Sequence, residues 1–136
     1  MRPTNGTTVD KSIRSNTMIA QNRQKFRVKR VKEFSDWLDT LDPVKLAVVL
    51  EREKNMEKGT FGDWRSVGDG VCEARIHVGA GVRIYYVKVS NMLVLLLHGG
   101  DKGSQDRDIR DAKNVLSRLK KRSEVMKERA REKNHE

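Results

Sequence analysis

The segment VCEARIHVGAGVRIYYVKV, residues 71–89, contains the clearest structural signal in this chain. Apolar and polar residues alternate on both sides of a short glycine-containing stretch, Gly79-Ala-Gly81. Such alternation is typical of β-strands that bury one face. The segment therefore predicts two strands, over residues 71–78 and 82–89, that pair as an antiparallel hairpin.

The register of this hairpin follows from a parity argument. A slip of one residue turns every side chain to the other face, so the numbers of paired residues must have an even sum if both apolar sets share a face. A three-residue loop over residues 79–81 meets this condition, and a two-residue loop does not. The predicted pairs are Val78 with Val82, His77 with Arg83, Ile76 with Ile84, Arg75 with Tyr85, and Ala74 with Tyr86.

The same register gathers polar side chains on the opposite face of the hairpin. Neighbouring strands bring side chains within contact distance of one another, so we expect these groups to share one surface. The predicted set is Glu73, Arg75, His77, Arg83 and Tyr85.

Two helices are predicted on the N-terminal side of the hairpin, after a short cationic edge strand at Phe26–Arg30. Apolar residues from Phe34 to Leu41 recur at the spacing of one helical face. Asp42 is expected to cap the second helix, with Pro43 in its first turn and Gly59 after its end. The residues expected to be buried in this helix are Val44, Leu46, Ala47, Val48, Val49 and Leu50.

On the C-terminal side, the continuous apolar run Met92–Leu97 predicts the most buried strand. A final helix is expected after it, with Ser104 as its N-cap. Its packing stripe is predicted at Ile109, Ala112, Leu116 and Leu119. Together the patterns predict an α+β fold, in which a small antiparallel, partly mixed sheet is packed by an N-terminal helical hairpin and a C-terminal helix.

The length of 136 residues favours a single domain, which we place at residues 26–122. The formal net charge is +10, and the positive excess lies towards the two ends of the chain. We expect residues 1–25 to form a basic, disordered extension and residues 123–136 a charged helical tail that frays. A strongly basic chain is typical of proteins with a polyanionic partner such as nucleic acid.

The single cysteine, Cys72, excludes an internal disulfide, and no apolar stretch is long enough for a membrane span. We therefore expect a cytoplasmic protein without a membrane partner. Three histidines and one cysteine show no metal-ligand spacing, and no phosphate-binding loop motif is present. The sequence predicts no cofactor and no metal site.

The polar residues of the hairpin and the following loop could bind and cleave RNA. Arginine and lysine stabilise phosphate oxygens, and the 2′-hydroxyl of RNA can attack the neighbouring phosphate when side chains carry its proton away. The candidate cations are Arg75, Arg83 and Lys102, and the candidate proton carriers are His77, His98, Tyr85 and Lys102.

Each candidate also has a structural explanation. Arg75 could pair with Glu73, Tyr85 could be a packing residue, and His98 could hydrogen-bond the backbone at the end of its strand. Lys102 could be a solvated loop residue, and His77 an exposed one.

Several motifs resemble those of the RelE/ParE superfamily of type II toxin–antitoxin toxins, in the branch of addiction-module killer or phage Gp49-like proteins. The resemblance covers about residues 26–120. The motifs that carry it are Phe34–Leu41 (FSDWLDTL), Gly59–Asp63 (GTFGD), Val67–His77 (VGDGVCEARIH), Gly79–Tyr86 (GAGVRIYY) and Leu95–Ile109 (LLLHGGDKGSQDRDI).

The resemblance implies a growth-inhibiting toxin that a cognate antitoxin neutralises, and the antitoxin is expected to be a helix-turn-helix protein encoded by the neighbouring gene. RelE-like members cleave mRNA on the ribosome without a metal, using cationic residues of the sheet. Arg75, Arg83 and Lys102 match those positions. The leading hypothesis is therefore a metal-independent mRNA endoribonuclease that inhibits translation. ParE-like members instead poison DNA gyrase, and a degenerate antitoxin-binding protein without activity is a third hypothesis.

Overall fold

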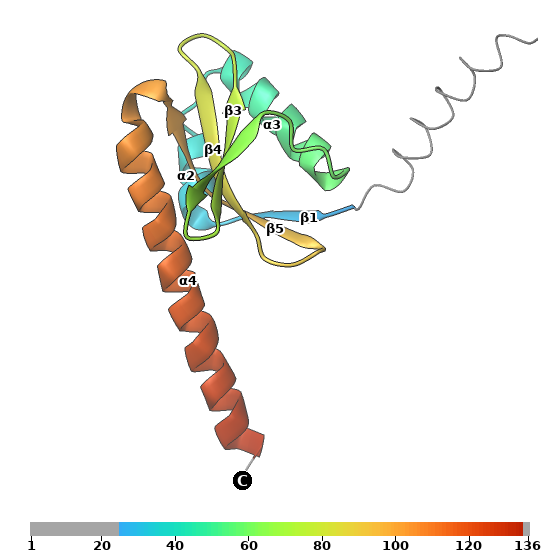
Figure 1. Cartoon of the computed structure of the whole chain (residues 1–136), viewed down its shortest axis with the longest axis vertical. Helices are drawn as coiled ribbons and strands as arrows, with labels where there is room; N and C mark the ends of the chain where they lie inside the picture. Colours follow the sequence, from blue (N-terminus) through green and yellow to red (C-terminus); the bar gives the residue numbers. More distant parts are fainter. Residues whose placement is uncertain (1–24, 135–136) are drawn as a thin grey trace, which may run out of the picture.

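The computed structural model describes residues 25–134, in which helices pack on a single β-sheet (Figure 1). The predicted α+β class is confirmed. The elements are β1 (Arg27–Arg30), α2 (Lys32–Leu38), α3 (Pro43–Glu57), β2 (Trp64–Gly68), β3 (Val71–Ile76), β4 (Val82–Lys88), β5 (Leu93–Asp101), a 3-10 turn (Lys102–Ser104) and α4 (Gln105–Asn134).

The five strands form one sheet in the order β1-β5-β4-β3-β2. The edge strand β1 runs parallel to β5, and all other pairs are antiparallel, so the sheet is mixed as predicted. β4 is the central strand, and β5, which carries the apolar run, lies beside it. Burial on both faces of β4 explains why Tyr85 and Tyr86, neighbours in sequence, are both fully buried.

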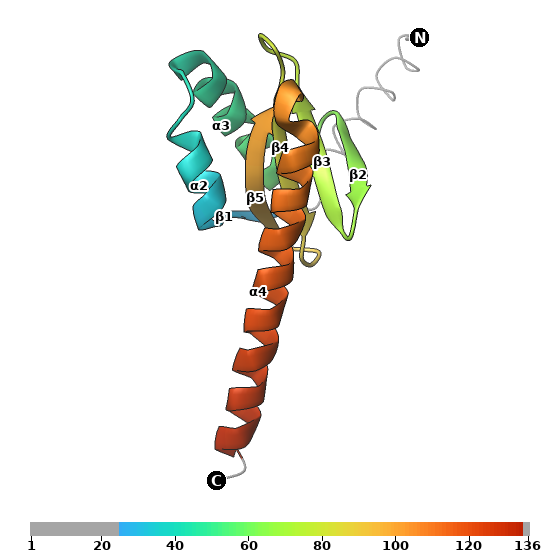
Figure 2. The same cartoon turned by 90° about the vertical axis from the view of Figure 1, so that its left-hand side faces the viewer.

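Helices cover both faces of the sheet (Figure 2). α2 and α3 lie on one face, where the even-numbered residues of β3 and β4 join their core. α4 lies on the other face and packs there with Tyr85 and Leu97. The predicted α4 stripe is confirmed, since Ile109, Ala112, Leu116 and Leu119 all belong to this second core.

α3 begins as predicted, because the Asp42 side chain accepts a hydrogen bond from the Lys45 backbone N–H at 2.9 Å. The burial predicted along this helix is wrong in part. Val44 is 64% exposed and Ala47 is also exposed, whereas Val49 and Met56 are buried. Only the stripe that faces the sheet is covered, and neither Val44 nor Ala47 lies on it.

The β3–β4 hairpin differs from its predicted register by two residues. Ile76 pairs with Val82 and Arg75 with Arg83, so residues 77–81 form the loop and His77 lies outside the strand. The loop closes through a hydrogen bond from the Gly81 N–H to the Val78 carbonyl, with Gly81 at a positive φ of 95°. An even shift leaves every side chain on its predicted face.

The start of α4 also differs from the prediction. Asp101, not Ser104, is the capping residue: its carboxylate accepts hydrogen bonds from the N–H groups of Gly103 and Ser104 and so stabilises the 3-10 turn ahead of the helix. α4 then continues to Asn134, well beyond the sheet (Figure 1).

The extension predicted over residues 1–25 lies, apart from Lys25, outside the described residues. Within residues 25–134, no helix combines the length and apolar character that crossing a membrane requires.

Candidate functional site

A pocket of about 340 Å³ lies at the β3–β4 hairpin and the turn after β5. Four of the six predicted site residues line it: Arg75, His77, Arg83 and Lys102. They come from separate strands and loops, so the fold brings together the cationic groups that the sequence places up to 27 positions apart. The pocket can therefore receive an anion such as a phosphate group.

Arg75 and Arg83 face each other across the hairpin, because they are directly paired in the sheet. Their side chains are 35% and 13% exposed, so Arg83 is the more enclosed. Both Nε atoms are buried without a hydrogen-bond partner among residues 25–134. A buried N–H without a partner is costly, and an anion that entered the pocket could supply an acceptor.

The fully buried carboxylate of Glu73 holds the side chain of Arg83 in position. Its oxygens accept hydrogen bonds from Arg65 at 2.8 Å and from Arg83, Tyr85 and Gln105 at 3.0 Å each. Burial by itself raises the pKa of Glu73, but the hydrogen bonds outweigh this effect and the net pKa lies below its usual range. Glu73 is therefore a carboxylate that holds Arg83 in one orientation.

Asp63 positions two other side chains of the pocket, Arg75 and His77. Its Oδ1 lies 3.3 Å from Arg75 Nη2, and its Oδ2 lies 3.0 Å from His77 Nε2. The hydrogen bond with His77 and the charge of Arg75 hold the pKa of Asp63 below its usual range. A carboxylate on one ring nitrogen orients the imidazole and leaves Nδ1 of His77 for contact with a ligand.

Tyr85 does not line the pocket. It is fully buried, and its hydroxyl donates to Glu73 at 3.0 Å. Burial, together with the Glu73 charge, raises the pKa of Tyr85 above its usual range. The prediction that Tyr85 carries protons is therefore at odds with this geometry, because a buried phenol that donates to a carboxylate contacts no substrate.

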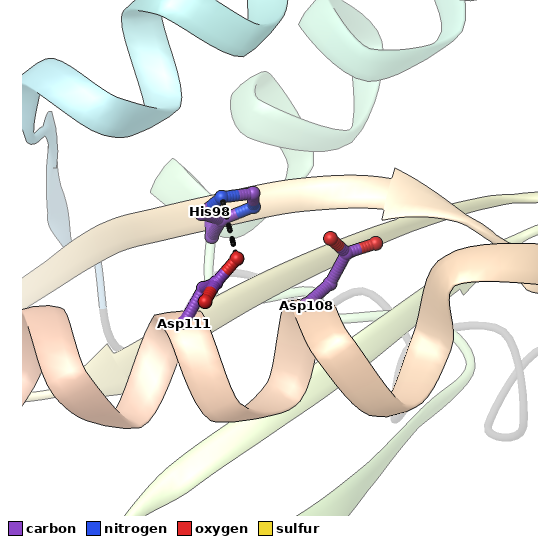
Figure 3. Close-up of side chains that lie close together, drawn as sticks. All are labelled: His98, Asp108 and Asp111. Atoms are coloured by element: carbon purple, nitrogen blue, oxygen red, sulfur yellow. Dashed lines mark ion pairs between the residues drawn. The ribbon is translucent and has the colours of Figure 1, made fainter.

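His98 lies in a different place, between β5 and α4 (Figure 3). A bulge in β5 causes this: Tyr85 pairs with His98 while Tyr86 pairs with Leu96, so Leu97 is an extra residue. Leu97 and His98 consequently both point towards α4, where His98 Nε2 lies 3.9 Å from an Asp111 oxygen. His98 is not part of the Arg75–Arg83 pocket.

Sequence reasoning missed the supporting carboxylates. The alternation in its strand places Glu73 on the polar face, but nothing in that pattern indicates that four donors converge on its carboxylate. Asp63 lies in a loop, twelve and fourteen positions before its partners Arg75 and His77, where no periodic pattern applies. Two signals mark the place: a turn glycine, Gly62, which has a φ of 65°, and the motif Gly59–Asp63, which ends at Asp63.

Comparisons with known proteins show which chains this one resembles. No model of a known protein family matches the chain. An uncharacterized protein of Haemophilus influenzae is 40% identical over 94 residues, which span 68% of this chain and 95% of that protein. A chain of the toxin–antitoxin complex RelBE2 from Mycobacterium tuberculosis is 19% identical, with a TM-score of 0.48 over 57% of this chain and 99% of that one.

Proposed function

The chain belongs to the same protein family as the uncharacterized Haemophilus influenzae protein, and we propose that it is the toxin of a type II toxin–antitoxin system that cleaves mRNA on the ribosome. The observation that carries this proposal is the pocket lined by Arg75, His77, Arg83 and Lys102. The motifs that resemble RelE/ParE toxins over residues 26–120 support it.

The pocket contains the groups that RNA cleavage requires. The 2′-oxygen attacks the adjacent phosphorus, the bond to the 5′-oxygen breaks, and a cyclic phosphate and a 5′-hydroxyl result. The charge that develops on the phosphate oxygens would be stabilised by Arg75, Arg83 and Lys102. These three cations come from two strands and one turn, so they can surround one phosphate.

The proton transfers need a base for the 2′-hydroxyl and an acid for the leaving oxygen. His77 is the proton carrier that the geometry favours, because it lines the pocket and Asp63 holds its Nε2 at 3.0 Å. Lys102, exposed on the turn after β5, is the second group within the pocket that can donate a proton. The chemistry as proposed uses side chains alone.

The cationic pocket also suggests how an antitoxin would act. An acidic or amphipathic segment laid across Arg75 and Lys102 would neutralise the pocket and block RNA. The partner we propose is a helix-turn-helix protein encoded beside this gene. Co-expression with that neighbour should restore growth and yield a complex that purifies intact.

Expression of the chain alone, followed by mapping of mRNA 5′ ends, tests the nuclease. Arg75→Ala and Lys102→Ala should each lower cleavage about 100-fold, the usual cost of removing a group that stabilises transition-state charge. Lys58→Ala, an exposed lysine just after α3, is the matched control and should cleave as the parent does. Circular dichroism checks that each variant folds.

Three outcomes would overturn the assignment. Growth arrest with intact transcripts and DNA-damage signalling would indicate the gyrase-poison alternative. Expression without growth arrest would indicate a degenerate antitoxin-binding protein. Cleavage that survives both pocket variants would place the active site elsewhere in the chain.

A further inference from the structure

A second cluster of chemically active side chains lies outside the pocket, at the junction of β5 and α4. His98, Asp108 and Asp111 each direct one ligand atom into a region where all three atoms lie within 4.8 Å of one another (Figure 3). We propose that this cluster binds a divalent transition-metal ion, with Zn²⁺ as the best match. The proposal is independent of the nuclease assignment.

The donor set fits such an ion. One imidazole nitrogen with two carboxylate oxygens is a combination that Zn²⁺ accepts, at about 2.0–2.2 Å from each ligand. Ligands at that distance from a shared ion are separated by about 3–4 Å. The 3.9 Å between His98 Nε2 and Asp111 Oδ2 is too long for a hydrogen bond and lies within that range.

The backbone orients His98 as metal ligands are usually oriented. Its Nδ1 lies 2.8 Å from both the carbonyl oxygen and the backbone nitrogen of Gly99, so the backbone holds the ring and directs Nε2 at the two carboxylates. In the tautomer protonated at Nδ1, which donates to the carbonyl, Nε2 carries the lone pair that binds a metal. The bulge in β5 also contributes, because it turns the His98 side chain towards α4. Without the bulge, His98 would face α2 and α3.

Asp108 is brought into the cluster by a glycine. It is only 3% exposed, and a Cβ on Gly100 would overlap its carboxylate, so glycine at this position is what admits Asp108 against the sheet. Asp108 lies in the first turn of α4, and two described side chains contact its carboxylate. Ser104 donates a hydroxyl hydrogen bond, and Arg107 Nε lies 3.9 Å away, which is the nearest cation that the described residues supply.

A buried carboxylate needs a cation or several donors to offset its lost hydration. Asp111 adds a second negative charge one helical turn away, and the described residues offer it no lysine or arginine within 4.0 Å. A divalent cation would neutralise both groups. It would also link β5 to α4, because the ligands come from both elements.

The site is accessible from solvent. A pocket of about 350 Å³ is lined by His98 and Asp108, and the Asp111 side chain is 46% exposed. Water can therefore complete the coordination of an ion held by three protein ligands.

Isothermal titration of the full-length, tag-free chain with Zn²⁺ tests the proposal. We expect the parent to bind one Zn²⁺ per chain. The affinity should be at least about 100-fold lower in His98→Gln and at least about 10-fold lower in Asp111→Asn. His77→Gln and His135→Gln are the matched controls and should bind as the parent does. The melting temperature should rise with Zn²⁺ in the parent and controls but not in His98→Gln.

Parent-like Zn²⁺ binding by His98→Gln would overturn the proposal, as would an equal loss in His77→Gln. Absence of binding by the parent at millimolar Zn²⁺ would do the same. If circular dichroism shows that His98→Gln does not fold, the exposed Asp111→Asn decides the question, because unchanged binding in that variant contradicts the assigned ligand set.

Discussion

Arg83 Nη1 donates to Glu73 Oε1 at 3.0 Å, and this contact joins the candidate active site to the buried interface beneath α4. The carboxylate is fully buried, whereas the arginine lines the solvent-accessible pocket. Because Gln105 of α4 also donates to Glu73, the orientation of Arg83 depends on α4 being docked on the sheet. The pocket and the second core are therefore one structural unit.

Replacing Glu73 should destabilise the protein strongly. Glu73→Ala would leave Arg83 and the Tyr85 hydroxyl without their acceptor, and breaking a buried ion pair by removal of one partner costs about 3–5 kcal/mol. Urea denaturation measures the change. Arg65→Ala removes an exposed donor to the same carboxylate, so it should cost far less. Equal losses in the two variants would contradict the central role assigned to Glu73.

The same carboxylate should make the protein sensitive to acid. The folded-state pKa of Glu73 lies below the ordinary glutamate value of 4.5, so the stabilisation is complete above that value and is lost as the pH falls through the folded-state pKa. The free energy of unfolding should therefore decrease steadily below about pH 4.5, and the acid limb should flatten in Glu73→Gln. Urea titrations between pH 7 and pH 3 test this. Parallel pH profiles for parent and variant would indicate that other carboxylates are responsible.

Much of the fold could be predicted because its signals are local. The alternation in residues 71–78 shows which side chains face the core, and Asp42-Pro43 marks the start of a helix. Both signals can be read from neighbouring residues alone. The hairpin register was missed because parity permits any even shift. The choice between loops of three and five residues depends on the backbone geometry at Gly81, which composition does not reveal. The strand β2 was missed because four of its five residues are exposed and it has no apolar alternation.

The candidate site was predictable only in part. Cations on alternating strand positions, such as Arg75 and Arg83, reveal their shared face directly. His98 could not be placed, because a bulge changes the face of a side chain and the apolar run before it hides the extra residue. Asp63 reaches Arg75 and His77, and Asp108 comes close to His98, through tertiary packing, which leaves no spacing pattern in a single sequence.

Gly99 should tolerate no side chain. A Cβ at this position would overlap the ring of Trp37 on α2, which packs against the sheet there. Gly99→Ala should therefore destabilise the protein by about 1–3 kcal/mol through overpacking. Gly103→Ala is the matched control, since its nearest neighbour would be an Asp101 oxygen at 3.3 Å. Thermal denaturation should show a clearly lower melting temperature for Gly99→Ala but not for Gly103→Ala. Equal melting temperatures in the two variants would contradict the tight contact between Gly99 and α2.

Asp63 should act on the rate of RNA cleavage rather than on folding. Asp63→Asn retains the shape of the side chain but removes the charge that Arg75 and His77 share, so the contacts that hold the guanidinium and the imidazole in place weaken. The variant should cleave about 10-fold more slowly, because the proton carrier is less well positioned. Asp69→Asn, an exposed aspartate that pairs with Lys113, is the control. A cleavage rate in Asp63→Asn equal to that of the parent would contradict the positioning role assigned to Asp63.

The distal part of α4 should supply salt-sensitive affinity for ribosomal RNA. It extends beyond the sheet and carries exposed cations at Lys120, Lys121 and Arg122. Each phosphate contact releases a counterion, so the logarithm of the affinity falls with the logarithm of the salt concentration, by about 0.7–0.9 per contact. Replacing the three cations by Gln should weaken binding and reduce this slope by up to about 2–3. Filter binding between 50 and 200 mM salt measures both quantities, and the double variant Lys54→Gln/Lys58→Gln on α3 and its cap is the charge control. A slope equal to that of the parent would show that α4 does not contact the RNA, and the affinity of the chain would then have to come from other basic residues.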